Sequence, residues 1–135
     1  MQSDDRIVAA GFSTTEDATQ TVVDEDVSLL RLRLDGTLDP DFGSGGKVLV
    51  AQPATFERAN AVAIQPADGK IVVAGFRRTS GNEDFLVARV SADGTRDPSF
   101  GSGGIVTEMD ALVAYLQVLG TMVDFADPAN ENLRQ

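Results

Sequence analysis

Short runs of β-branched and other large apolar residues, separated by Gly, Asp, Asn and Pro, follow one another from Ile7 to Thr107. Runs of this length and composition predict β-strands rather than helices. The turn at residues 66–69 ends in Asp-Gly, which favours a hairpin because Gly takes positive φ without a Cβ clash. The runs expected to form strands are residues 6–12, 25–32, 47–50, 60–65, 70–76, 83–90 and 104–107.

This strand pattern occurs twice in the chain. Residues 6–12 return with close similarity at 70–76, and residues 35–46 return at 93–104. The first offset is six residues longer than the second, which places an insertion in the polar stretch 13–24. The function must come from an array of repeats, because one repeat of this size cannot bury its own apolar face.

Each repeat is expected to form four short strands with the same Gly-rich crossover before the last one, which is the content of a propeller blade. The sequence therefore predicts an all-β fold of about two four-stranded antiparallel propeller-like blades, an incomplete propeller, at residues 1–106. Blade 1 is expected at about 5–50 and blade 2 at about 59–106. Blade 1 is short of its opening strand, because only Met1 to Asp5 precede the run 6–12.

Residues 107–135 depart from the repeat and predict one C-terminal α-helix followed by a polar tail. Thr107 with Asp110 resembles a capping box at the start of this helix. The apolar run 111–123 is too short to span a bilayer. We expect it to dock on the sheets or on another chain rather than to anchor at a membrane surface, which would need basic residues. The apolar positions on one side of the helix are Met109, Leu112, Val113, Leu116, Leu119 and Val123.

Composition narrows the possible functions. The 11 basic and 21 acidic residues give a formal net charge of -10, which disfavours nucleic acid and anionic lipid surfaces as partners. The sequence contains no cysteine and no histidine, so it lacks a thiolate nucleophile, the usual zinc ligands and the usual general base. No cofactor or metal is expected. The first residues do not have the pattern of a signal peptide, and the compartment is not predicted.

Three motifs of the second repeat occur in order, with counterparts in the first. They are Asp-Gly-Lys-Ile-x-Val-Ala-Gly at 68–75, Asp-Phe-x-x-x-Arg at 84–89 and Asp-Gly-Thr-x-Asp-x-x-Phe-Gly-x-Gly-Gly at 93–104. This pattern closely resembles the delta-60 repeat, a bacterial β-propeller-type repeat, over about residues 5–106. The resemblance implies a propeller-like architecture and a scaffold or binding role, with no reaction attached, and it allows a secreted or cell-surface protein.

A second resemblance covers residues 108–121. This segment looks like the C-terminal helix of the monohaem cytochrome c subunit of cbb-type terminal oxidases. Haem binding is not carried over, because the chain has no Cys-x-x-Cys-His. A chimeric or recombined reading frame, joined near Val106, would explain how the two resemblances meet.

The Gly-rich phrase at residues 43–46 could turn backbone amides toward an anion. Neither a Lys-Ser/Thr pair nor a helix follows it, however, and the phrase recurs in both repeats. We therefore favour a tight crossover in which Phe42 and Phe100 fill the space between blades.

Asp35, Asp39 and Asp41 in the first repeat, and Asp93 and Asp97 in the second, could offer oxygens to calcium. The spacing of an EF-hand is absent, and no nearby Glu closes a coordination shell. Hydrogen bonds to the local backbone, as in Asx-turns, are the favoured interpretation.

Two further charged pairs recur, Asp26 with Arg31 and Asp84 with Arg89. Residues five apart on a strand fall on opposite faces. Each residue is therefore expected to pair across strands or blades, in a structural ion pair.

Arg77 and Arg78 form a local basic spot in the second polar loop and are expected at a solvated loop tip.

The overall prediction is a non-catalytic β-propeller-type module, a fragment or chimera, that acts as a binding or interaction scaffold without catalytic, cofactor-binding or metal residues. Its expected partners are itself or other propeller repeats, through open blade edges. The alternatives are a polypeptide that associates with a cbb-type cytochrome oxidase through its C-terminal helix, and a propeller-based hydrolase or lyase.

Overall fold

The computed structural model describes residues 2, 5–50 and 55–107. Each run predicted to be a strand contains one. The strands are β1 (Ile7–Glu16), β2 (Val22–Leu32), β3 (Lys47–Val50), β4 (Phe56–Ile64), β5 (Ile71–Thr79), β6 (Asn82–Val90) and β7 (Ile105–Thr107).

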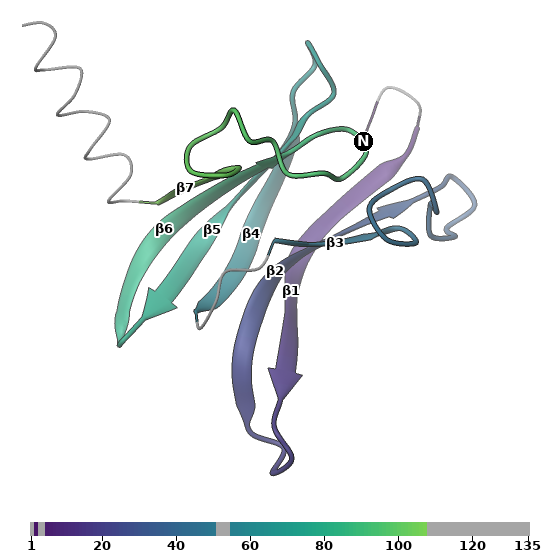
Figure 1. Cartoon of the computed structure of the whole chain (residues 1–135). Coiled ribbons are helices and arrows are strands. Elements are labelled where there is room, and N and C mark those ends of the chain that lie inside the picture. Colours follow the sequence, from purple (N-terminus) through teal and green to yellow (C-terminus); the bar gives the residue numbers. More distant parts are fainter. Residues whose placement is uncertain (1, 3–4, 51–54, 108–135) are drawn as a thin grey trace, which may run out of the picture.

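The seven strands form one sheet whose order is β1-β2-β4-β5-β6-β7, with β3 paired to β2. In the first repeat, β2 is antiparallel to both β1 and β3. In the second repeat, β4 to β7 form a meander of antiparallel neighbours. A parallel pairing between Glu25 of β2 and Phe56 of β4 joins the repeats. Figure 1 shows the repeats as two groups of strands that diverge from this link.

The chain is all-β as predicted, but the predicted arrangement, about two four-stranded antiparallel propeller-like blades plus one C-terminal helix, is wrong. The repeats share one seven-stranded sheet, to which the first contributes three strands, and the described residues contain no helix. The sheet is continuous because β3 covers β2 only from Val27 to Leu30, so the same edge of β2 accepts Phe56 at Glu25. Apart from Thr107, which ends β7, the predicted helix and tail at 107–135 lie outside the described residues. Within the described part, therefore, no helix could cross a membrane.

The insertion in the first repeat lengthens a hairpin. β1 and β2 have 10 and 11 residues, whereas β5 and β6 have 9 each. The turn is held by Asp17, whose Oδ1 accepts hydrogen bonds from the backbone N–H of Thr19 at 2.8 Å and of Thr21 at 3.1 Å. The polar stretch 13–24, which the sequence places in a loop, is therefore mostly strand.

One apolar core holds the two repeats together. Side chains alternate between the two faces of a strand, and each repeat directs one face toward this core. Because a single cluster draws on strands of both repeats, each repeat buries its apolar face against the other. The buried members are Val27, Leu29, Phe42, Val48, Val50, Ile71, Val73, Leu86, Ala88, Val90 and Ile105.

Candidate functional site

The first repeat places an arginine, an aspartate and a phenylalanine in one buried cluster. Arg31 of β2 donates a hydrogen bond from Nε to Asp39 Oδ2 at 2.7 Å. Its guanidinium lies 4.7 Å from the centre of the Phe42 ring, in a cation–π contact. All three residues are buried. The cluster fixes the Gly-rich crossover to the strand that precedes it, and the Asp39 N–H also donates to the Arg31 carbonyl at 2.9 Å.

The second repeat builds the same cluster with more exposure to solvent. Arg89 Nε donates to Asp97 Oδ2 at 2.8 Å, and its guanidinium lies 4.6 Å from the centre of the Phe100 ring. Asp97 is buried, but Arg89 and Phe100 are half-buried. The predicted role of the phenylalanines in filling the space between repeats is thus confirmed for Phe42, whereas Phe100 lies at an outer face.

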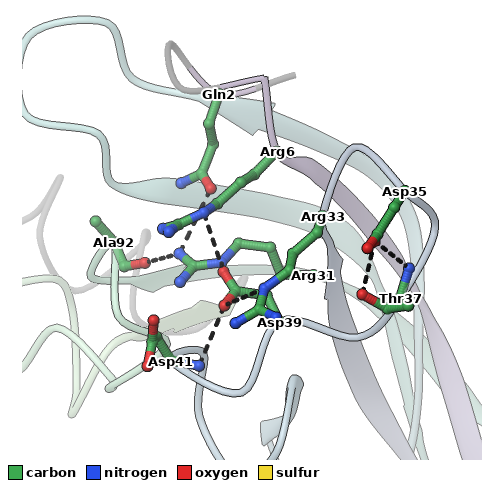
Figure 2. Close-up of polar contacts among 9 residues, drawn as sticks. All are labelled: Gln2, Arg6, Arg31, Arg33, Asp35, Thr37, Asp39, Asp41 and Ala92. Carbon is green, nitrogen blue, oxygen red and sulfur yellow. Dashed lines mark hydrogen bonds and ion pairs between the residues drawn. The ribbon is translucent and has the colours of Figure 1, made fainter.

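Each buried aspartate has further cations near it. In the first repeat Arg6 Nε lies 3.2 Å from Asp39 Oδ2, and Arg33 Nε lies 3.8 Å from Asp39 Oδ1. Figure 2 shows these guanidinium groups with that of Arg31 around the one carboxylate. In the second repeat Lys70, the counterpart of Arg6, lies 2.9 Å from Asp97. A buried carboxylate that pairs with an arginine of one strand and with a cation directly before the neighbouring strand is therefore part of the repeat.

Both buried aspartates have a lowered pKa. Burial by itself would raise the pKa of Asp39, but hydrogen bonds from the Asp41 N–H and the Arg31 guanidinium outweigh it. The hydroxyl of Ser99 and the ammonium group of Lys70 hold the pKa of Asp97 well below its usual range. Both groups are therefore ionised at neutral pH, which suits a structural counter-charge rather than a proton donor.

The two Asp-Gly-Thr turns are Asx-turns, as predicted. Asp35 Oδ1 accepts from the Thr37 N–H at 2.9 Å and from its hydroxyl at 2.6 Å. Asp93 accepts from Thr95 in the same way, at 2.9 and 2.7 Å. The part of the chain that the structure describes contains no group of three or more acidic side chains placed to hold a metal ion.

The crossover of the first repeat docks on the turn of the second, in a contact that we call the repeat joint. The Gly43 N–H donates to the Asp93 carbonyl at 2.8 Å, and Arg31 Nη1 donates to the Ala92 carbonyl at 2.5 Å. Gly94 is buried here. A Cβ atom on Gly94 would lie 2.6 Å from Val48 and 3.1 Å from Phe42, so the joint requires glycine.

A cavity of about 600 Å³ opens beside the repeat joint, with polar side chains from both repeats. Figure 2 shows Gln2 and Arg6 reaching over Arg31, with Ala92 and Asp41 on the other side. The cavity is thus the place where the charged residues of both repeats converge. Its polar lining comprises Gln2, Arg6, Arg31 and Asp41 from the first repeat and Gln65 and Asp93 from the second.

Of the residues expected to pair across strands or blades, Asp84 does so, with Arg77 Nε at 3.8 Å from its Oδ2 on the neighbouring strand. Arg31 and Arg89 instead pair with Asp39 and Asp97 in the crossovers of their own repeats. Asp26 Oδ1 is buried without a hydrogen-bond partner among the described residues. Arg78 pairs with Glu83. Arg77 and Arg78 lie in β5 and not at a loop tip, so their predicted place is wrong.

Two features escaped the sequence analysis. Arg58 forms a bidentate ion pair with Glu25 at 2.6 and 2.7 Å and lies 4.3 Å from the centre of the Phe12 ring, linking β4 to the first repeat. The recurrence of Glu25 as Glu83 could have marked this position as part of the repeat. Arg58, however, lies in a segment that has no counterpart in the first repeat. Glu57 is fully buried, accepts from the Thr55 hydroxyl at 2.9 Å and has no partner at Oε2 among the described residues.

Comparisons with known proteins give one family. The model of a domain of unknown function described as a beta-propeller, DUF5122, matches residues 2–42 and 67–100, which together exceed half of the chain. The matched segments contain both Arg-Asp-Phe clusters and both Asx-turns. No curated protein matches. No solved structure matches either.

Proposed function

The chain belongs to the DUF5122 family of β-propeller domains, and we propose that it is a non-catalytic interaction module whose partners bind the outer faces of its strands. The proposal rests on the structural role of the repeated charged residues. Arg31 with Asp39 and Arg89 with Asp97 recur at the same spacing, and each pair fixes a crossover to a strand. Charges that recur in this manner support a role in building repeats rather than in a single reaction centre.

The placement of Glu57 favours a module over a hydrolase or lyase. Burial raises the pKa of Glu57, which is the property expected of a general acid. Glu57, however, lines neither the cavity beside the repeat joint nor a second cavity of about 610 Å³ beside β2 and β3. A general acid must reach the atom that it protonates, so Glu57 is poorly placed for catalysis.

The finer assignment to the delta-60 repeat is part of this proposal, and rests on the three ordered motifs. An association with a cbb-type oxidase stays a prediction from the sequence alone, because it rests on residues 108–121, which lie outside the described residues.

Exposed apolar side chains supply the surface that such a module needs. Large side chains on the outer faces include Ile7 at 41%, Leu49 at 57% and Phe85 at 45% exposure. Exposed apolar side chains on both outer faces support an interaction role.

The test is the state of association of the full chain in solution. Sedimentation velocity from micromolar to millimolar concentration, with the fold checked by circular dichroism, should give a sedimentation coefficient that rises with concentration. A folded chain that stays monomeric over the whole range, and that binds no propeller repeats added in excess, would contradict the proposal.

A further inference from the structure

The two repeats bury opposite faces of equivalent strands. β2 directs Val27 and Leu29 into the core, whereas β6 directs Leu86 and Ala88. Residues 58 positions apart are equivalent, so Leu86 and Ala88 correspond to Ser28 and Leu30, on the other face of β2. The first repeat therefore uses one face of its strands in the core, and the second repeat uses the opposite face.

The second repeat consequently presents outward the face that the first repeat buries. We call this the second-repeat outer face. Phe85 and Val87 correspond to the buried Val27 and Leu29. Its members are Phe85, Val87, Arg89, Phe100 and Val106, whose counterparts Val27, Leu29, Arg31, Phe42 and Val48 are all buried in the core or the repeat joint.

The first repeat presents the complementary face, lined by Ser28, Leu30, Lys47 and Leu49, which we call the first-repeat outer face. These residues and Ser13 border a hollow of about 610 Å³. The counterparts of these four in the second repeat are Leu86, Ala88, Ile105 and Thr107, which are all buried. The hollow is thus the position that the core side chains of a neighbouring repeat would fill.

The hydrogen-bond donors and acceptors of the repeat joint also have counterparts on the outer sides of the two repeats. The counterparts of its donors are Arg89 and the Gly101 N–H, and no backbone hydrogen bond from that N–H is present among the described residues. The counterparts of its acceptors are the carbonyls of Leu34 and Asp35, which accept no backbone hydrogen bond from the described residues. Gly36, the counterpart of the buried Gly94, is exposed, and a Cβ on it would meet nothing within 4 Å.

We propose that a second copy of this chain docks head to tail, with its second-repeat outer face on the first-repeat outer face of the other copy. The inference rests on the proposed function and names the partner. In this contact Phe100 packs on the Asp35-Gly36 turn of the other copy, and the Gly101 N–H donates to the Asp35 carbonyl. The internal joint of each chain is the template, so the contact uses only the two outer faces and the turns beside them.

Such a contact is heterologous, because it joins two different faces. Heterologous contacts leave one free face at each end of a dimer and continue until a ring closes or a filament forms. Propellers close with about four to eight blades, so a small ring of two-repeat chains is the expected end point. A symmetric dimer, in contrast, would pair one face with itself.

The heterologous geometry can be tested by blocking one face at a time in the full chain. Leu49→Arg places a charge in the hollow of the first-repeat outer face. Phe85→Arg places a charge on the second-repeat outer face. Both side chains are about half exposed, so the monomer should stay folded. Val23→Arg is the control, because Val23 is 48% exposed at the hairpin end of β2 and belongs to neither face.

Each blocked variant should lose self-association by about 30-fold or more, the effect of losing one central contact, while the control associates like the unchanged chain. An equimolar mixture of the two variants should form a 1:1 dimer and stop there, because one intact face remains on each. Single variants that still dimerise, or a mixture that stays monomeric, would overturn the head-to-tail contact while leaving an interaction module possible. An unchanged chain that never associates and binds no repeats would overturn the proposed function as well.

Discussion

Arg31 and Asp39 form an ion pair at 2.7 Å in which neither side chain exposes more than 4% of its surface. The equivalent pair, Arg89 and Asp97 at 2.8 Å, has side-chain exposures of 19% and 6%. The two pairs have the same geometry, and differ because the second repeat covers the first pair through the hydrogen bond from Arg31 to Ala92. The outer position of the second pair leaves it uncovered in a single chain.

Asp39→Asn should destabilise the chain more than Asp97→Asn. The substitution leaves the buried Arg31 charge without its nearest counter-charge, which is the costly way to break an internal ion pair. In the second repeat Arg89 and Lys70 are part-exposed, so water compensates for the lost carboxylate. Thermal unfolding at neutral pH, followed by circular dichroism, should give the lower midpoint for Asp39→Asn. Equal midpoints, or the reverse order, would refute the difference in burial as the cause.

The stability of the chain should fall in acid, in part because of the same two carboxylates. The pKa of each is lower in the folded state than in the unfolded chain. Their contribution is therefore complete above the unfolded pKa of about 3.9, and is lost as the pH falls through the folded pKa. Urea unfolding of the unchanged chain at successive pH values below about 5 should show this loss, and Asp97→Asn should show a shallower one. An unchanged slope in the variant would contradict the assignment.

Glu57 should have the opposite effect on the pH dependence. Burial, more than the neighbouring Asp26, raises the pKa of Glu57 in the folded state. A carboxyl group with a raised folded pKa favours folding while it is protonated, and destabilises the fold as the pH rises from the unfolded to the folded pKa. Glu57→Gln should therefore raise the free energy of unfolding at neutral pH and have less effect in acid. Glu83→Gln is the control, because Glu83 is exposed and pairs with Arg78 at the surface.

The strands and turns could be predicted because their signals are local. An Asp-Gly-Thr turn depends on Asp35 and Thr37, which are neighbours in sequence, and the hydrogen bonds confirm it. The pairing of Glu25 with Phe56 could not be predicted, since it depends on how far β3 extends along β2. Phe42 and Phe100 occupy the same place in the same motif, yet one is buried and the other half-exposed. Burial is decided by what lies on the neighbouring face, and a repeat motif does not contain that information.

Gly75→Ala and Gly11→Ala should differ although the two glycines are equivalent in the repeats. A Cβ atom on Gly75 would collide with the Arg58 carbonyl and lie 2.9 Å from the Ala59 Cα, because β4 bulges toward it. A Cβ atom on Gly11 would meet nothing within 4 Å. Overpacking of this kind costs about 1–3 kcal/mol, whereas the change at Gly11 should stay within about 0.5 kcal/mol. Chemical denaturation measures both values, and a large loss for Gly11→Ala would imply a strand packed on β1 that the described residues do not include.

Phe42→Ala and Phe100→Ala should separate folding from association. Phe42 is fully buried, so its truncation should cost about 3–5 kcal/mol of unfolding free energy. Phe100 is half-buried on the second-repeat outer face, so its truncation should cost clearly less in the monomer, and should weaken the association of the chain. Denaturation at micromolar concentration gives the first quantity, and sedimentation of the folded variants at high concentration gives the second. If Phe100→Ala destabilised the monomer as much as Phe42→Ala and left association unchanged, the second ring would belong to the interior of one chain, and the proposed contact between copies would lose its central residue.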